Sequence, residues 1–147
     1  MSLKEKLQQD LTESMRARDE IRSSTIRMIL TSIRNEEVAG KEAKELDEKE
    51  LIAVLSREAK KRREAAEAFD QAGAKDRGDA ERAEGKIIAE YLPQQLTEAE
   101  VKDLVAAAIK ETGAATPAQM GLVMKSLQPK IAGRADGALV SNLVKAA

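Results

Sequence analysis

The sequence predicts an all-α protein, and three observations support that prediction. Of the 147 residues 42% are hydrophobic, yet the chain has one Phe, one Tyr and no Trp, so its core must consist of helix-compatible aliphatic side chains. Apolar residues recur at three- and four-residue spacing along most of the chain. Capping residues, glycines and prolines stand where such stretches begin and end. We expect N-terminal helical hairpins or a small bundle, followed by a compact three-helix module.

Two helices are predicted in the first 40 residues. Leu3, Leu7, Leu11 and Met15 form one apolar stripe on the first. The second covers residues 20–38 and ends at Gly40 as a left-handed C-cap. Its buried face is predicted to comprise Ile26, Ile29, Leu30 and Ile33, widened by Ile21 and Met28.

Two further helices complete a four-helix unit over residues 1–93. Asp47 with Glu50 resembles a capping box and starts a helix that ends at Gly73. The fourth covers residues 79–92, where Gly85 costs roughly 1 kcal/mol relative to alanine. The inner faces are predicted to comprise Leu51, Ile52, Leu55, Ala59, Ala66 and Phe69, then Ala80, Ala83, Ile87 and Tyr91.

Residues 94–147 are predicted to form the three-helix module. Pro93 stops the preceding helix, and Thr97 with Glu100 forms a capping box for a helix that ends at Gly113. A short helix follows Thr116 and Pro117 and is expected to end at Pro129, with Gly121 marking a close helix contact. The last helix covers residues 137–145, with Asp136 as its N-cap. The inner faces of the first and last of these helices are predicted to comprise Val101, Leu104, Val105, Ala108 and Ile109, then Leu139, Val140, Leu143 and Val144.

Composition excludes several classes of protein. Without cysteine or histidine, the chain can form neither a disulfide nor a thiolate metal site, nor a Cys–His nucleophile pair. We expect no metal site, no cofactor, no signal peptide and no membrane association, because no apolar run approaches the ~20 residues of a membrane span. The expected location is the cytoplasm.

Basic residues near the C-terminus are the main candidates for ligand contact. The last 36 residues contain four basic side chains and one acidic side chain, a net charge of +3. Lys125, Lys130 and Arg134 are expected to surround the turn before the last helix, whose N-terminus, capped by Asp136, also favours an anion. They are the predicted phosphate contacts.

Secondary candidates lie in the N-terminal unit, and each has a structural alternative. Lys60, Lys61 and Arg63 could contact phosphates, or this charged run could pair with glutamates at i, i+4 along a solvated helix face. Arg27 could extend a binding surface or cover the edge of the core with its stem. Tyr91 could stack on a base or fill a packing gap between the two units.

Five sequence motifs together are similar to the YqeY family, whose members share a domain with the C-terminal tail of GatB, a component of the aspartyl/glutamyl-tRNA amidotransferase. The motifs are Arg22-Ser23-Ser24-Thr25-Ile26-Arg27, Lys60-Lys61-Arg62-Arg63-Glu64 with Phe69, Tyr91-Leu92-Pro93-Gln94-Gln95-Leu96, Met120-Gly121 with Val123-Met124, and Gly133-Arg134-Ala135-Asp136-Gly137. The resemblance covers essentially the whole chain. It departs at Leu122, where many relatives have lysine.

The resemblance implies a tRNA-binding accessory protein without its own catalytic site. The family label "carbon-nitrogen ligase with glutamine as amido-N-donor" implies an alternative, a component that is active only inside a complex. A third hypothesis is a protein-interaction module in translation, whose partners would be an amidotransferase or other translation proteins. The residues offer no catalytic cysteine or histidine and no glycine loop for ATP.

Overall fold

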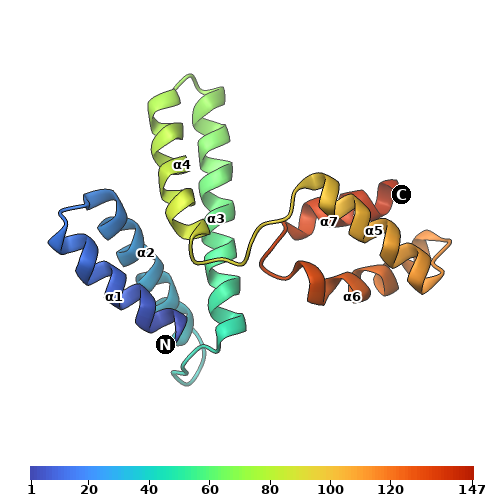
Figure 1. Ribbon diagram of the computed structural model, residues 1–147, viewed down its shortest axis with the longest axis horizontal. Coiled ribbons are helices and arrows are strands. Elements are labelled where there is room, and N and C mark those ends of the chain that lie inside the picture. Colours follow the sequence, from blue (N-terminus) through green and yellow to red (C-terminus); the bar gives the residue numbers. More distant parts are fainter. The chain divides into compact units, whose positions relative to one another are not determined.

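The computed structural model describes residues 1–147 as seven α-helices and one short 3-10 helix, without strands (Figure 1). This confirms the predicted all-α class. The chain divides into two compact units, unit 1 (Met1–Leu92) and unit 2 (Pro93–Ala147). No helix is both long enough and apolar enough to cross a membrane.

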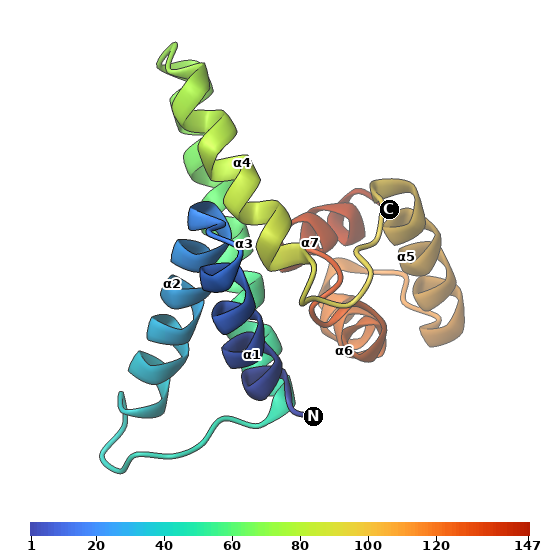
Figure 2. The same cartoon turned by 60° about the vertical axis from the view of Figure 1, so that its left-hand side comes forward.

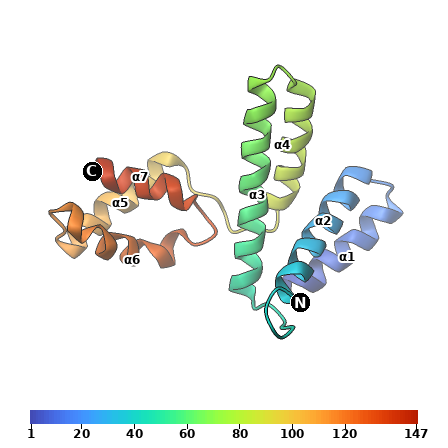
Figure 3. The ribbon, with the colours of Figure 1, turned by 180° about the vertical axis from the view of Figure 1, so that it is seen from behind.

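Unit 1 consists of two helical hairpins. Its helices are α1 (Leu3–Arg16), α2 (Glu20–Glu37), α3 (Glu48–Gln71) and α4 (Lys75–Ala89). The first hairpin pairs α1 with α2, and the second pairs α3 with α4, as Figure 3 also shows from behind. An extended loop connects the two hairpins (Figure 2). Both hairpins contribute to one core, because α2 packs on α3 and on α4.

The core of unit 1 is aliphatic apart from one tyrosine. Its buried members are Leu7, Ile26, Ile29, Ile33, Leu46, Leu51, Val54, Leu55, Ala59, Ile87, Ile88 and Tyr91. Leu3, Leu11, Met28 and Leu30 are half-buried against it, in agreement with the predicted faces of the first two helices.

Three predicted core positions in unit 1 are wrong. Met15 is 45% exposed because a four-residue spacing drifts by roughly 40° per step, which carries it away from Leu7. Ile21 is 57% exposed because roughly 140° of helix rotation separates it from Ile26. Ala80 is exposed near the start of α4.

The helix ends of unit 1 follow local signals with two exceptions. The predicted bounds 79–92 of the fourth helix are wrong, because α4 covers Lys75–Ala89 and begins after Ala74 without a side-chain cap. Asp47 accepts a hydrogen bond from the Glu50 amide at 2.8 Å, and Gly73 after α3 has a φ of 76°. Gly40 is not the predicted left-handed cap of α2. The helix ends earlier, and Val38 caps it by donating its amide to the Arg34 carbonyl at 3.2 Å, with a φ of −107°.

Unit 2 contains α5 (Glu98–Thr112), the 3-10 helix η1 (Pro117–Gln119), α6 (Met120–Ile131) and α7 (Gly137–Ala146). The predicted capping box of Thr97 and Glu100 is confirmed, as are the left-handed Gly113 with a φ of 68° and the Asp136 cap. The buried core comprises Val101, Val105, Ala108, Val123, Leu127, Ile131, Val140 and Val144.

Two predictions about α6 are wrong. The helix continues through Pro129 to Ile131, because burial of Leu127 and Ile131 holds the last turn and Ala132 donates its amide to the Gln128 carbonyl at 3.1 Å. Gly121 does not mark a close contact. It is exposed, and a Cβ added to it would meet nothing within 4 Å.

Candidate nucleic-acid interface

The two lysines of the main candidate set are exposed on α6. Lys125 makes no ion pair. The Lys130 ammonium lies 4.0 Å from a carboxylate oxygen of Glu111, and both side chains are about half exposed or more. Lys125 and Lys130 are five positions apart, so roughly 140° of rotation separates their side chains around the axis of α6. The pair therefore offers two mobile cations along α6 and no rigid pocket for one phosphate.

Arg134 has a structural role that its sequence position did not indicate. Its Nε donates to the Gln94 carbonyl at 3.0 Å, and its Nη1 donates to the Lys130 carbonyl at 3.3 Å. The guanidinium thus links the start of unit 2 to the end of α6, where the last carbonyl groups of the helix have no hydrogen-bond donor within the helix. Part of its hydrogen-bonding capacity is used inside the fold, which leaves less for a phosphate.

The same turn binds the segment that precedes α5. Gln95 donates from Nε2 to the Gly133 carbonyl at 2.7 Å and to the Pro93 carbonyl at 2.9 Å. The Leu96 amide donates to the Arg134 carbonyl at 2.8 Å. Two of the family-like motifs, 91–96 and 133–137, are therefore partners in one hydrogen-bonded framework, which their separation in sequence concealed.

The basic run on α3 is largely neutralised by carboxylates. Arg62, whose side chain is 13% exposed, lies 3.6 Å from Glu58, 3.6 Å from Glu81 and 2.9 Å from Glu84. It also donates to the Met28 sulfur, so this one side chain connects α2, α3 and α4. The i, i+4 spacing of Arg62 to Glu58 within this basic run predicted their pairing, which the structure shows.

The named candidates of this run differ among themselves. Lys61 is 3.4 Å from the buried Glu58 carboxylate, which also accepts from the Ser32 hydroxyl at 3.1 Å. Lys60 is half-buried and also has an interaction partner. Arg63 is exposed and makes no ion pair. The i, i+4 pairing alternative therefore describes Arg62, whereas Lys61 pairs with Glu58 at i, i+3 and Arg63 makes no ion pair.

Arg27 lies beside the α1–α2 turn and contacts the side chain of Met15. Its Nη2 is 3.0 Å from the Met15 sulfur, and both residues line a shallow hollow with Arg18. Arg18 has a φ of 58°, the left-handed region that non-glycine residues seldom occupy. The structure does not bring Arg27 together with Lys61 or Arg63 through any hydrogen bond.

Tyr91 is a core residue of unit 1. It is 8% exposed, and its hydroxyl donates to Asp10 of α1. Burial, together with this hydrogen bond, raises the pKa of Tyr91 above its ordinary range. Next to it, Arg22 binds Glu90 through two hydrogen bonds of 2.6 and 3.1 Å, which lower the pKa of Glu90. A base could not stack on this ring without opening the core.

The structure offers no cluster of three or more carboxylates that could hold a metal ion. Among the candidate cations named from the sequence, Lys125 and Arg63 are exposed without an ion pair, Lys130 is exposed with only the 4.0 Å contact to Glu111, and Arg27 is exposed beside Met15.

The sequence matches the family described as "Yqey-like protein" over residues 4–147. It is similar to "Altered inheritance of mitochondria protein 41, mitochondrial" of Lachancea thermotolerans, with 33% identity over 113 residues, 76% of this chain and 60% of that protein. The proteins of the same name from Eremothecium gossypii and Kluyveromyces lactis are 34% and 35% identical, over 58% of this chain in each case.

The chain spans about half the length of the relatives it matches, 46% and 45% of the last two. Their names place those relatives in mitochondria and state no activity.

Proposed function

The chain belongs to the YqeY family, and from that premise we propose that it is a non-catalytic accessory protein that binds tRNA through backbone phosphates. The supporting observation is that Lys125 and Lys130 are exposed on α6, the first without an ion pair and the second with only a 4.0 Å contact to Glu111. Long, solvated lysine side chains suit contacts to phosphates whose positions vary, and such contacts carry little base specificity.

Arg134 enters this proposal as a positioning residue. Its guanidinium holds the Gln94 and Lys130 carbonyl groups, so it fixes the end of α6 from which Lys130 projects. Loss of Arg134 would therefore weaken binding by disturbing the framework. Loss of Lys125 or Lys130 would weaken it without that disturbance.

Charge reversal tests the proposal in a filter-binding assay with unfractionated tRNA at low salt. The Lys125→Glu/Lys130→Glu variant is expected to bind at least tenfold more weakly than wild type, because two attractive phosphate contacts become repulsive. The matched control, Lys41→Glu/Lys49→Glu, changes the net charge equally at two exposed unit 1 lysines. It is expected to bind within about threefold of wild type, since the effect of net charge alone on distant sites is screened.

Equal losses in both variants would indicate a general charge effect, and unchanged binding by the α6 variant would exclude this surface. Circular dichroism should show the wild-type melting temperature for the α6 variant and a lower one for Arg134→Ala. That comparison separates the binding role from the framework role.

One observation favours protein interaction as a second candidate function. Leu122 is 54% exposed on α6. An exposed apolar side chain at this position suits a protein partner in translation better than a phosphate. Binding to that partner would depend on Leu122 and only weakly on salt.

A further inference from the structure

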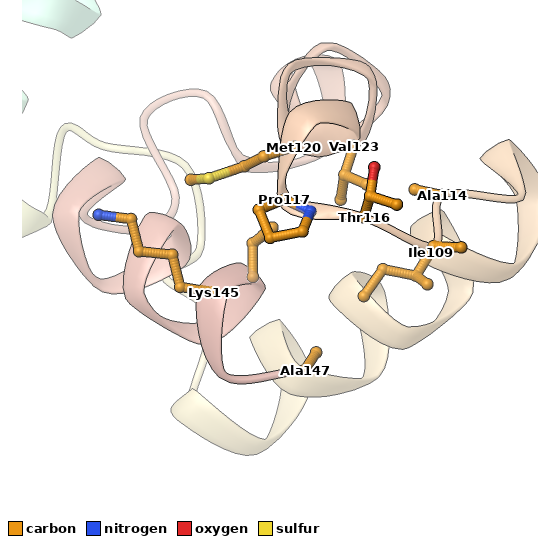
Figure 4. A pocket seen from close by; sticks show the side chains of 10 residues that line it. Ile109, Ala114, Thr116, Pro117, Met120, Val123, Lys145 and Ala147 are labelled. Atoms are coloured by element: carbon orange, nitrogen blue, oxygen red, sulfur yellow. The ribbon is translucent and has the colours of Figure 1, made fainter.

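Unit 2 contains a hollow of about 450 Å³ that opens to the surface (Figure 4). It lies between the end of α5, the segment before α6, and the end of α7. Its walls include Ile109, Pro117, Met120, Val123, Val144 and Lys145. The volume falls within the range of about 300–1,000 Å³ that is typical of small-molecule sites.

The walls are apolar and continuous with the core. Val123 is 1% exposed and Val144 is 8% exposed, and both belong to the buried cluster of unit 2. Met120 and Ile109 are half-buried against that cluster. Water beside such side chains finds few hydrogen-bonding partners, so transfer of a hydrocarbon chain into the hollow is favourable.

Lys145 gives the hollow a charge preference. It is exposed, it makes no ion pair, and it is the charged side chain among the lining residues. In Figure 4 its side chain extends on the same side as Met120, with the ammonium group pointing away from Ile109. An apolar wall with a cation at its rim complements an amphiphile with an anionic head.

The backbone around the hollow favours a hydrocarbon chain over an extended peptide. The amides of Ala115 and Thr116 both donate to the side-chain oxygen of Gln119, at 2.7 and 3.3 Å. These amides are therefore already satisfied and cannot pair with a peptide backbone, as strand addition would require.

We propose that this hollow binds a medium-chain fatty carboxylate. The tail packs against Ile109, Val123 and Val144, and the carboxylate lies beside Lys145. This site is separate from the phosphate contacts of Lys125 and Lys130. The proposal of fatty-acid binding therefore does not depend on tRNA binding.

Methyl-detected NMR on the full chain tests the proposal with hexanoate, octanoate and decanoate as probes. Chemical shifts are expected to move at Ile109, Met120, Val123 and Val144, with methyl groups of unit 1 unaffected. Each pair of added methylenes should raise the affinity about tenfold, because burial of each one contributes about 0.8 kcal/mol. Absence of shifts with decanoate, or shifts spread over both units, would overturn the proposal.

Three variants locate the ligand. Lys145→Gln should weaken decanoate binding two- to fivefold, as loss of an exposed ion pair does, and should leave 1-decanol binding unchanged. Lys110→Gln, at an exposed α5 lysine outside the lining, should change neither. Ala114→Leu adds a side chain at the wall and should abolish binding with unchanged helicity by circular dichroism. Wild-type affinity for decanoate in Lys145→Gln or Ala114→Leu would refute the assigned position.

Discussion

Basic side chains in this protein divide into those that hold the fold and those that face solvent. Arg62 and Arg134 each bind groups from separate segments, whereas Lys125 and Arg63 are exposed without ion pairs. Sequence spacing indicated the Glu58–Arg62 pair because that contact is local. The contacts of Arg62 with Glu81 and Glu84, and of Arg134 with backbone carbonyls, arise from tertiary packing and leave no periodic signal.

Arg62 is expected to be essential for the stability of unit 1. The Arg62→Ala variant should lose about 2 kcal/mol of unfolding free energy, because the Glu58 carboxylate, 5% exposed, would keep Lys61 alone as its cation and Glu81 and Glu84 would lose Arg62. Urea unfolding followed by circular dichroism measures this loss. Arg63→Ala, the neighbouring exposed control, should change stability by less than about 0.5 kcal/mol, and equal effects of the two variants would contradict the assigned role.

Tyr91 provides a direct pH test, because it is the single tyrosine in a chain without tryptophan. Its raised pKa means that the folded state favours the neutral phenol. The preference for the neutral phenol stabilises the folded state fully below the ordinary tyrosine pKa near 10. This stabilisation is lost as pH rises above that value. Absorbance titration at the phenolate band should show ionisation well above pH 10 in the native protein and near 10 in denaturant. Native ionisation near 10 would contradict the buried hydrogen bond to Asp10.

At the scale of the helices, side-chain caps predicted helix starts, whereas α4, which has no such cap, begins at Lys75 and not at the predicted residue 79. Thr97 and Asp47 cap their helices as their spacing to Glu100 and Glu50 indicates, because a cap depends on neighbours within one turn. The helix ends predicted at Gly40 and Pro129 are wrong, because α2 ends before the glycine and packing of the last turn extends α6 beyond the proline. The end of a helix thus depends on the core it covers as well as on its own residues.

Alanine substitutions at Gly78 and Gly85, two glycines of α4, are expected to change the stability of the α3–α4 hairpin in opposite directions. A Cβ at Gly78 would lie 2.5 Å from an Asp70 carboxylate oxygen that Arg82 also holds, and 3.1 Å from the Ala66 carbonyl oxygen. Gly78→Ala should therefore lower stability by about 1 kcal/mol despite better helix propensity. At Gly85 the nearest atom is 3.7 Å away, so Gly85→Ala should raise stability by up to about 1 kcal/mol. Thermal unfolding measures both changes, and equal signs would refute the packing argument.

For the whole molecule, composition was sufficient to predict the fold class. Aliphatic side chains at helical spacing, with almost no aromatic residues, leave few alternatives to helical packing. The surface available to a ligand was less predictable, because ion pairs and hydrogen bonds decide which cations remain free. Of the candidates named from sequence, Lys125, Arg63 and Arg27 remain without ion pairs, whereas Lys61 is paired and Arg134 binds backbone carbonyls.

Each unit has its own buried cluster, so unit 2 is expected to fold without unit 1. A fragment of residues 93–147 should show helical circular dichroism and one cooperative thermal transition, although its small core makes it only marginally stable. Gln95→Ala in that fragment should lower the melting temperature, since Gln95 holds the Gly133 carbonyl. A fragment without a cooperative transition would show that the framework needs unit 1.

The salt dependence of tRNA affinity tests the central claim, that this chain binds a polyanion through a few mobile cations. For two to three phosphate contacts, log K should fall linearly with log salt at a slope of about −2 to −3, and the Lys125→Glu/Lys130→Glu variant should flatten that slope by about 2. A slope near zero in the wild type, or an unchanged slope in the variant, would contradict the account.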